Sequence, residues 1–318
     1  MNETLWLGKP YYSLDAYCKN TYGTKLYKIA LNAGFTCPNR DGTLGTRGCI
    51  FCSGEGSGEH SRRITPKDNF SDIIAASLSQ VSYKKTGERY IAYFQSYTNT
   101  YGPVAYLDRI YRLALEEPSV AGISIATRPD CLQPDVLLLL QQLQDEYPGK
   151  FIWVELGLQT IHENTALFIR RGYPLSCFEK AVSDLTAIHI PIIVHMILGL
   201  PGESCEQQLQ SISYLNTIPV QGIKLQLLHL LKGTDLGKRY EESPQIYHSY
   251  ETMEEYLQVL ISCLEHLRPD MVIHRLTGDA PRELLLSPLW SLHKRTVLNT
   301  LHHQMKLQSA YQGRLYLP

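Results

Sequence analysis

The sequence predicts an α/β protein built on a partial (β/α)6 barrel of the TIM type, with a mostly helical C-terminal extension. Six short runs rich in β-branched and aromatic residues alternate with helical stretches before residue 235. Such alternation is typical of parallel strands joined by right-handed crossovers. Six units fit an incomplete barrel better than a doubly wound sheet. We expect a core over residues 1–240 and an extension over residues 241–318.

The expected strands and helices follow one another in a regular order. The strands are Lys25–Leu31, Tyr90–Gln95, Ala121–Thr127, Phe151–Leu156, Ile190–Leu198 and Gly222–Leu228. The helices between them are Pro66–Thr86, Pro103–Glu117, Gln133–Tyr147, Ser176–Ile188 and Glu203–Asn216. Pro103 and Pro134 stand where proline suits the first turn of a helix. In a barrel of this kind, the chemistry lies at the C-terminal ends of the strands.

The alternation stops after about residue 240. Ser249–Leu267 is an expected helix, and Met271–Pro281 reads as a short strand and turn. From Arg282 to Pro318 the chain carries five basic side chains against a single acid, Glu283. This basic tail is either a surface that contacts nucleic acid or an ordinary solvated face.

Bulk composition excludes several classes of protein. The 318 residues carry a formal net charge of −1, so the whole molecule is not a polycation. No apolar run approaches the roughly 18 residues of a membrane span, and the N-terminus does not read as a signal peptide. Eight cysteines in a chain of this length do not form a disulfide scaffold. We therefore expect a cytoplasmic protein with no membrane partner.

Three of the cysteines, Cys37, Cys49 and Cys52, follow the first expected strand with the spacing C-x11-C-x2-C. Three thiolates can hold three irons of a cubane cluster and leave the fourth iron open to a ligand. A zinc site would need a fourth ligand, for which His60 is nearest, but zinc sites usually use two short-spaced pairs. A dithiol redox pair would use Cys49 and Cys52 and leave Cys37 unexplained. The position after the first strand favours the cluster.

Six segments, each at an expected strand end or turn, carry a family resemblance. They are Asn32–Asp41, Tyr93–Tyr101, Ala126–Asp130, Val154–Gln159, His195–Glu203 and His274–Pro281. Over nearly its whole length the chain resembles radical S-adenosylmethionine (SAM) enzymes. Within that superfamily it is similar to the YtqA/YhcC subgroup, relatives of the Elongator catalytic subunit. The cysteine spacing departs from the commoner C-x3-C-x2-C of the superfamily and is similar to that of the subgroup.

The resemblance implies two cofactors, a [4Fe–4S] cluster and SAM. The open iron would bind the amino and carboxylate groups of SAM, and one electron would split its sulfonium into methionine and a 5′-deoxyadenosyl radical. That radical would take a hydrogen atom from the substrate. The protein would supply orientation and exclude water. A reductant such as flavodoxin or ferredoxin is the implied electron donor.

Three residues near strand ends are candidates for binding SAM. Glu155 lies in an apolar strand, and a buried carboxylate needs donors, which SAM or a cation on a neighbouring strand would supply. The resemblance gives Gln159, at the end of that strand, a similar SAM-facing role. Gly199 allows either close backbone approach to a flat ligand such as adenine or tight packing in a turn.

Two more positions are assigned to SAM by the resemblance. An arginine after the fourth expected strand approaches the SAM carboxylate in related enzymes, and Arg171 is our choice over Arg170. Guanidinium groups match carboxylates in this way. Gln95 and Ser96 end the second expected strand, where the superfamily contacts the SAM amino group. Many relatives have Gly-Gly-Glu there, whereas this chain has Gln-Ser-Tyr.

The candidate catalytic residues are His195, Lys224 and His229. His195 shares a strand face that points toward the expected barrel interior, although a lone histidine is more often structural. Lys224 and Gln226 share a face of the sixth strand, with His229 and Lys232 just beyond. A lysine inside a barrel needs an anionic partner, which would be either a substrate carboxylate or a structural acid.

The resemblance implies tRNA as the substrate. The subgroup is associated with trimming a carboxymethylaminomethyl group on the wobble uridine to aminomethyl. The basic tail and some of the 21 tyrosines would suit unpaired RNA. Two alternatives stay open, a radical SAM enzyme acting on a small molecule or protein, and a non-catalytic, metal-stabilised RNA-binding module.

Overall fold

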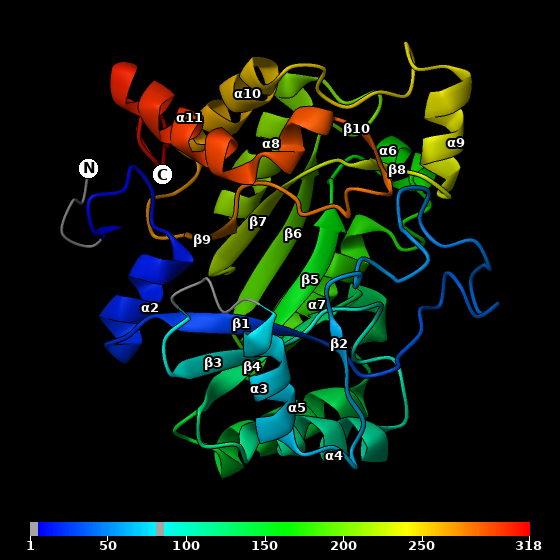
Figure 1. The fold of residues 1–318 in the computed structure, drawn as a ribbon, viewed down its shortest axis with the longest axis vertical. Coiled ribbons are helices and arrows are strands. Elements are labelled where there is room, and N and C mark those ends of the chain that lie inside the picture. Colours follow the sequence, from blue (N-terminus) through cyan, green and yellow to red (C-terminus); the bar gives the residue numbers. More distant parts are fainter. Residues whose placement is uncertain (1–5, 81–85) are drawn as a thin grey trace.

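The protein folds around a curled sheet of parallel strands. A computed structural model describes residues 6–80 and 86–318, and in this part of the chain eight strands form one sheet in the order β2-β1-β3-β4-β5-β6-β7-β9. The sheet curves into a half-barrel (Figure 1). Its strands are β1 Leu26–Asn32, β2 Arg62–Arg63, β3 Arg89–Phe94, β4 Val120–Thr127, β5 Phe151–Gln159, β6 Ile192–Leu198, β7 Gly222–Leu227 and β9 Val272–Arg275.

The predicted partial barrel is confirmed. The six expected strands are the central ones, β1 and β3 to β7, and each pairs in parallel with its neighbours. Two short edge strands that were not part of the predicted barrel, β2 and β9, extend the sheet. All residues of β4 are buried, as expected of a parallel strand covered on both faces.

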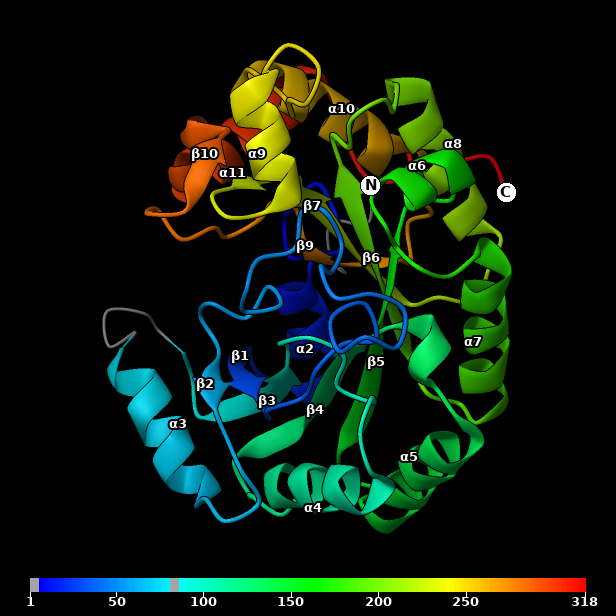
Figure 2. The same ribbon diagram turned by 90° about the vertical axis from the view of Figure 1, so that its right-hand side faces the viewer.

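Helices cover the outer face of the half-barrel, where α3, α4, α5 and α7 lie side by side around the sheet (Figure 2). The helices up to the sixth crossover are α2 Leu14–Tyr22, α3 Phe70–Ser79, α4 Val104–Leu115, α5 Pro134–Glu146, α6 Glu163–Phe168, α7 Leu175–Ala187 and α8 Cys205–Asn216. On α4, Leu107, Ile110 and Tyr111 are fully buried. This i, i+3, i+4 spacing forms the apolar stripe that packs the helix on the sheet.

The expected helix Pro66–Thr86 is shorter in the structure. It begins at Phe70, because Asn69 caps it by accepting a hydrogen bond from the backbone N–H of Ser71. It ends at Ser79, and the last residues of the expected range, 81–85, lie outside the described part of the chain.

The C-terminal region is mostly helical, as predicted. It contains α9 Asp235–Glu242, α10 Met253–His266, α11 Lys294–Leu307 and a 3₁₀ turn, Leu289–Leu292. Near the end of this region, β10 Leu285–Ser287 pairs antiparallel with β8 Leu230–Leu231. A second 3₁₀ turn, Pro129–Cys131, lies in the barrel core after β4. Because β9 joins the main sheet, the region is connected to the barrel, and the division near residue 240 stays a prediction.

A small second core joins the cysteine loop to the strand ends. Ile50 packs with Ile169, Ile197 and Leu236 in this cluster. Backbone hydrogen bonds fix the same contacts, since Ile50 donates to the carbonyl of Ile169 at 3.1 Å and Leu236 donates to the carbonyl of Ile50 at 2.8 Å. The cysteine loop is therefore held against α6 and α9. Within the described ranges, none of the helices has both the length and the apolar character needed to span a bilayer.

Candidate active site

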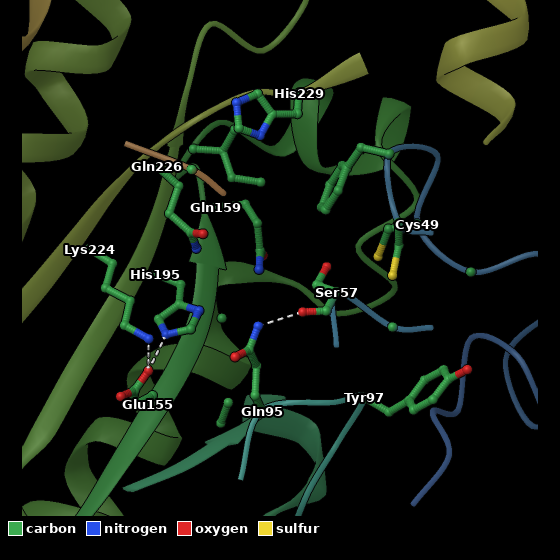
Figure 3. Close-up of a pocket in the computed structure, with 18 of the residues that line it drawn as sticks. Cys49, Ser57, Gln95, Tyr97, Glu155, Gln159, His195, Lys224, Gln226 and His229 are labelled. Carbon is green, nitrogen blue, oxygen red and sulfur yellow. Dashed lines mark hydrogen bonds and ion pairs between the residues drawn. The ribbon is translucent and has the colours of Figure 1, made fainter. Parts of the chain in front are cut away.

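A cavity of about 260 Å³ lies at the C-terminal ends of the strands, where a barrel of this kind carries its chemistry. Cys37, Cys49 and Cys52 all line it. Figure 3 shows Cys49 on one side of the cavity and Glu155 and Lys224 on the other. The site therefore has a cysteine side, formed by the loop after β1, and a strand side, formed by β3 to β9.

The cysteine side is built from tight turns. The backbone N–H of Cys52 donates to the carbonyl of Cys49 at 3.0 Å, and the N–H of Arg40 donates to the carbonyl of Cys37 at 2.8 Å. Burial, followed by the neighbouring Cys52, raises the pKa of the Cys49 thiol to about 12. A cationic ligand is therefore needed before this thiol ionises at neutral pH.

Two polar residues that sequence reasoning missed hold this loop. The side-chain amide of Asn39 donates to the carbonyls of Arg170 at 2.8 Å and Arg171 at 3.2 Å. The guanidinium of Arg40 donates to the carbonyls of Cys52 at 2.9 Å and Ser53 at 2.5 Å. Their signal in the sequence was their position in the polar segment that follows Cys37. Polar residues of a loop that carries a functional group are candidates for holding that loop in place.

Glu155 is the centre of the strand side. Its side chain is fully buried and accepts hydrogen bonds from Lys28 at 2.7 Å, Ser124 at 2.6 Å, His195 at 2.6 Å and Lys224. Burial opposes ionisation of this carboxyl, but Lys224 and Lys28 outweigh it and hold the pKa of Glu155 well below its usual range. The carboxylate is therefore paired within the protein, but by lysines of β1 and β7 rather than, as expected, by a cation on a strand next to β5.

His195 and Lys224 are both positioned by this carboxylate. Burial, followed by the charge of Lys224, lowers the pKa of His195 to about 4, so its ring is neutral at pH 7. Because an ionised Glu155 only accepts, the Nε2 atom of His195 carries the proton in their 2.6 Å hydrogen bond. The ammonium of Lys224 also donates to the hydroxyl of Tyr93 at 2.9 Å.

Comparison with known proteins decides the family. The family model of the radical SAM superfamily matches residues 41–215, and the radical SAM C-terminal domain matches residues 220–307. The chain belongs to the radical SAM superfamily. Protein YtqA of Bacillus subtilis is 40% identical over 97% of this chain and 93% of its own length. YhcC of Escherichia coli is 34% identical over 93% of this chain and 94% of its own. The predicted subgroup is confirmed.

The Elongator relation is more distant. Elongator complex protein 3 of Bos taurus is 23% identical over 59% of this chain, which spans 32% of that protein. The solved structure of Elp3 from the archaeon Methanocaldococcus infernus superposes with a TM-score of 0.64 at 16% identity. It covers 91% of this chain and 65% of its own, and it shows that the two share a fold.

The cofactors of this radical SAM protein are a [4Fe–4S] cluster and SAM, and the cysteine side fits them. Cys37, Cys49 and Cys52 would hold the cluster, and no other cysteine of the described chain lines the cavity, which matches a cluster with one iron left for SAM. When bound, the cluster supplies the electron that cleaves the sulfonium of SAM and yields a 5′-deoxyadenosyl radical.

The zinc interpretation finds no support in the geometry of the described residues. Across residues 6–80 and 86–318, no group of three His, Cys, Asp or Glu side chains is placed to hold a single metal ion. His60 is exposed and does not line the cavity. Three thiols spread around one cavity, in a radical SAM chain, instead suit a larger cluster.

Gln95 and Gln159 are SAM candidates that reach the cavity (Figure 3). Two other candidates, Glu155 and Arg171, also line it. The amide of Gln95 donates to the carbonyl of Ser57 at 2.6 Å, so it bridges β3 to the cysteine side. The amide oxygen of Gln159 accepts from the hydroxyl of Tyr173 at 3.2 Å. Both amides keep further hydrogen-bonding capacity toward the cavity.

Ser96 and Gly199 are not among the residues that line the cavity, and their contacts with SAM stay predictions. The hydroxyl of Ser96 lies 2.7 Å from that of Ser61 and is buried against the loop before β2. Gly199 has a φ of +85°, and a Cβ there would come within 2.9 Å of Ser249 and Tyr250. Tight packing, the other expected reason for this glycine, therefore accounts for it.

The two arginines after β5 are occupied by the protein itself. The buried guanidinium of Arg171 donates to the carbonyls of Tyr173 at 2.9 Å and Thr160 at 2.7 Å, and it contacts Glu163 at 3.2 Å. Arg170 forms an ion pair with Asp235 at 2.6 Å. Arg171 nevertheless lines the cavity, and its contact with the SAM carboxylate stays a prediction.

His229 also reaches the cavity, but its environment differs from that of His195. It lines the cavity together with Gln226, whereas Lys232 is exposed outside it. The Nε2 atom of His229 is buried, and the described residues give it no hydrogen-bond partner. Burial lowers the pKa of His229 to about 4. This neutral imidazole faces the site with one ring nitrogen unused.

Proposed function

We propose that the protein trims the carboxymethylaminomethyl group of a tRNA wobble 2-thiouridine to aminomethyl. The carrying observation is the shape of the cavity, which runs from three cysteines to a buried polar strand side, in a chain related to the Elongator catalytic subunit. A cavity of this kind admits one flipped-out nucleoside side chain rather than a duplex. The hydrogen atom to be removed would come from the CH2 between the amine and the carboxylate.

The residues around the cavity have distinct proposed roles. Gln95 and Gln159 orient SAM from the ends of β3 and β5, because their amides face the cavity with unused hydrogen-bonding capacity. Glu155 fixes Lys224 and His195 in place through buried hydrogen bonds. His229 is neutral at pH 7, and its Nε2 has no hydrogen-bond partner among the described residues, so it accepts a hydrogen bond from the substrate amine.

A stacked cation–aromatic surface beside the cysteine loop supports RNA as the substrate. The rings of Phe168 and Tyr247 are parallel within 2°, and the guanidinium of Arg239 lies over both at 5.3 and 5.5 Å. The adjacent Leu167 and Ile246 are 74% and 64% exposed. Unpaired bases stack on such groups regardless of sequence. We call these five residues the stacking surface.

The basic tail gives weaker support for RNA as the substrate. Lys294 forms an ion pair with Asp279, and Arg314 forms one with Glu265, so part of its positive charge is neutralised within the protein. Arg282 is exposed directly after Pro281, which lines the cavity. We infer that this end of the tail, rather than α11 as a whole, lies near bound RNA.

The remaining partners follow from the chemistry. A low-potential reductant of the flavodoxin or ferredoxin type would supply the electron. All eight cysteines are free, which suits the cytoplasmic location that we propose.

Nucleoside mass spectrometry of tRNA from a strain lacking the gene tests the proposal. We expect carboxymethylaminomethyl-2-thiouridine to accumulate and its aminomethyl derivatives to disappear, with recovery by the wild-type gene but not by Cys49→Ser. An unchanged nucleoside profile would refute the tRNA assignment and favour a small molecule or protein as the substrate. Anaerobic reconstitution without cluster formation or SAM cleavage would instead favour the non-catalytic RNA-binding module.

A further inference from the structure

The strand side of the cavity holds more positive than negative charge. Two ammonium groups, that of the half-buried Lys28 and that of the buried Lys224, converge on the single carboxylate of Glu155. Arg275 lines the same cavity, and its partner Asp279, at 3.5 Å, is shared with Lys294 at 2.7 Å. Among these described side chains, two carboxylates therefore serve four cations.

The strand register places two of these cations directly opposite each other. Lys224 of β7 pairs with Arg275 of β9, and on the other side it pairs with His195 of β6. Like charges directly opposite on neighbouring strands destabilise a sheet. Burial is the largest influence lowering the pKa of Lys224, and Lys28 and Arg275 lower it further against the pull of Glu155. An anion between Lys224 and Arg275 would remove this conflict.

We propose that Lys224 and Arg275 form a subsite that binds the carboxylate of the substrate. The inference rests on the proposed function, because the carboxymethylaminomethyl group ends in a carboxylate. An arginine and a lysine facing one cavity can each donate to such a group through charge-assisted hydrogen bonds. The neighbouring Nε2 of His195 is already committed to Glu155.

SAM also carries a carboxylate, so the two sources must be told apart. The family chemistry places the SAM carboxylate at the open iron, on the cysteine side. Figure 3 shows Lys224 on the opposite side of the cavity from Cys49. The subsite therefore holds the substrate with its carboxylate away from the cluster and its CH2 and amine toward the middle of the cavity.

The test compares two anticodon stem-loop RNAs that differ only in charge. One carries the carboxymethylaminomethyl group and the other its neutral carboxamide, and both are bound to the reconstituted holoenzyme with SAM. We expect the wild type to bind the acid about 10- to 100-fold more tightly, the range expected for hydrogen bonds to charged groups. Lys224→Met and Arg275→Gln should each lose most of this preference, whereas Lys232→Met, an exposed control outside the cavity, should keep it.

Three outcomes would overturn the subsite. They are equal binding of the acid and the amide by the wild type, full retention of the preference in both cavity variants, and weakened SAM binding in Lys224→Met with either RNA. Arg275→Gln keeps the test decisive if Lys224→Met does not fold, because Arg275 is partly exposed. Failure of the proposed function is distinguishable, since the acid would then bind preferentially but never be converted.

Discussion

Replacing Glu155 with glutamine tests how the buried charge cluster contributes to stability. The neutral amide keeps the shape of the side chain but leaves Lys28 and Lys224 without the carboxylate on which both depend. The amide nitrogen of the new glutamine is itself a donor, so it cannot accept hydrogen bonds from the ammonium groups. Breaking a buried pair by removing one partner typically costs about 3 to 5 kcal/mol. For a chain of this length, that loss lowers the melting temperature by about 4 to 7 °C.

Thermal and urea unfolding of the apo protein under reducing conditions would measure this effect. Ser124→Ala provides the matched control, because it removes a neutral donor at 2.6 Å from the same carboxylate but leaves both ion pairs, and it should cost less, about 1.5 to 3 kcal/mol. The double variant Glu155→Gln/Lys224→Met should recover part of the loss, since one of the two unpaired ammonium groups is then absent. A Glu155→Gln protein within 1 kcal/mol of the wild type would refute this account of the cluster.

Three further predictions concern the cluster, pH and RNA. Cys49→Ser should abolish the iron content and visible absorbance of the reconstituted protein, whereas Cys131→Ser, outside the cavity, should leave both unchanged. His195 and His229, with pKa values near 4, bind fewer protons than the unfolded chain between pH 4 and 6.5, so stability should fall with acidification across that window. Each should contribute about 2 kcal/mol of loss at pH 5, and urea titrations of His229→Gln should show a correspondingly flatter pH dependence. Arg239→Ala should weaken stem-loop RNA binding about tenfold in fluorescence anisotropy, whereas Arg112→Ala on α4 should not.

The fold was largely predictable because its signal is local and repeated. Each central strand is an apolar run long enough to cross a covered sheet, and each crossover helix carries a stripe that packs on it. A short strand was expected from Met271, where β9 lies, but the place of the two edge strands in the sheet carried no such signal. β2 has only two residues, and β9 lies after a long helical stretch that interrupts the alternation. Their pairing depends on the sheet already being formed.

The site was predictable only where one residue type has few possible roles. Three clustered cysteines admit few alternatives, and all three line the cavity. Arg171, by contrast, could donate to any nearby acceptor, and the carbonyls that occupy it come from a turn whose course the sequence does not reveal. Lys28 and Arg275 were missed for the same reason. Arg275 lies opposite Lys224 only because β9 joins β7 in the folded sheet, and Lys28 of β1 reaches Glu155 of β5 only because the sheet is curled.

The uneven charge of the strand side is better explained by ligand binding than by stability. A core designed only for stability would replace Lys28, Lys224 and Glu155 with apolar residues of similar volume, since such replacement is often neutral or stabilising. A purely structural pair would need one lysine, not two with an arginine directly opposite. Buried groups with strongly shifted pKa values that line a cavity are typical of functional sites. The additional cation therefore has a use only when an anion enters the cavity. The stability that the apo protein loses through this uneven charge is linked to its selection of an anionic substrate.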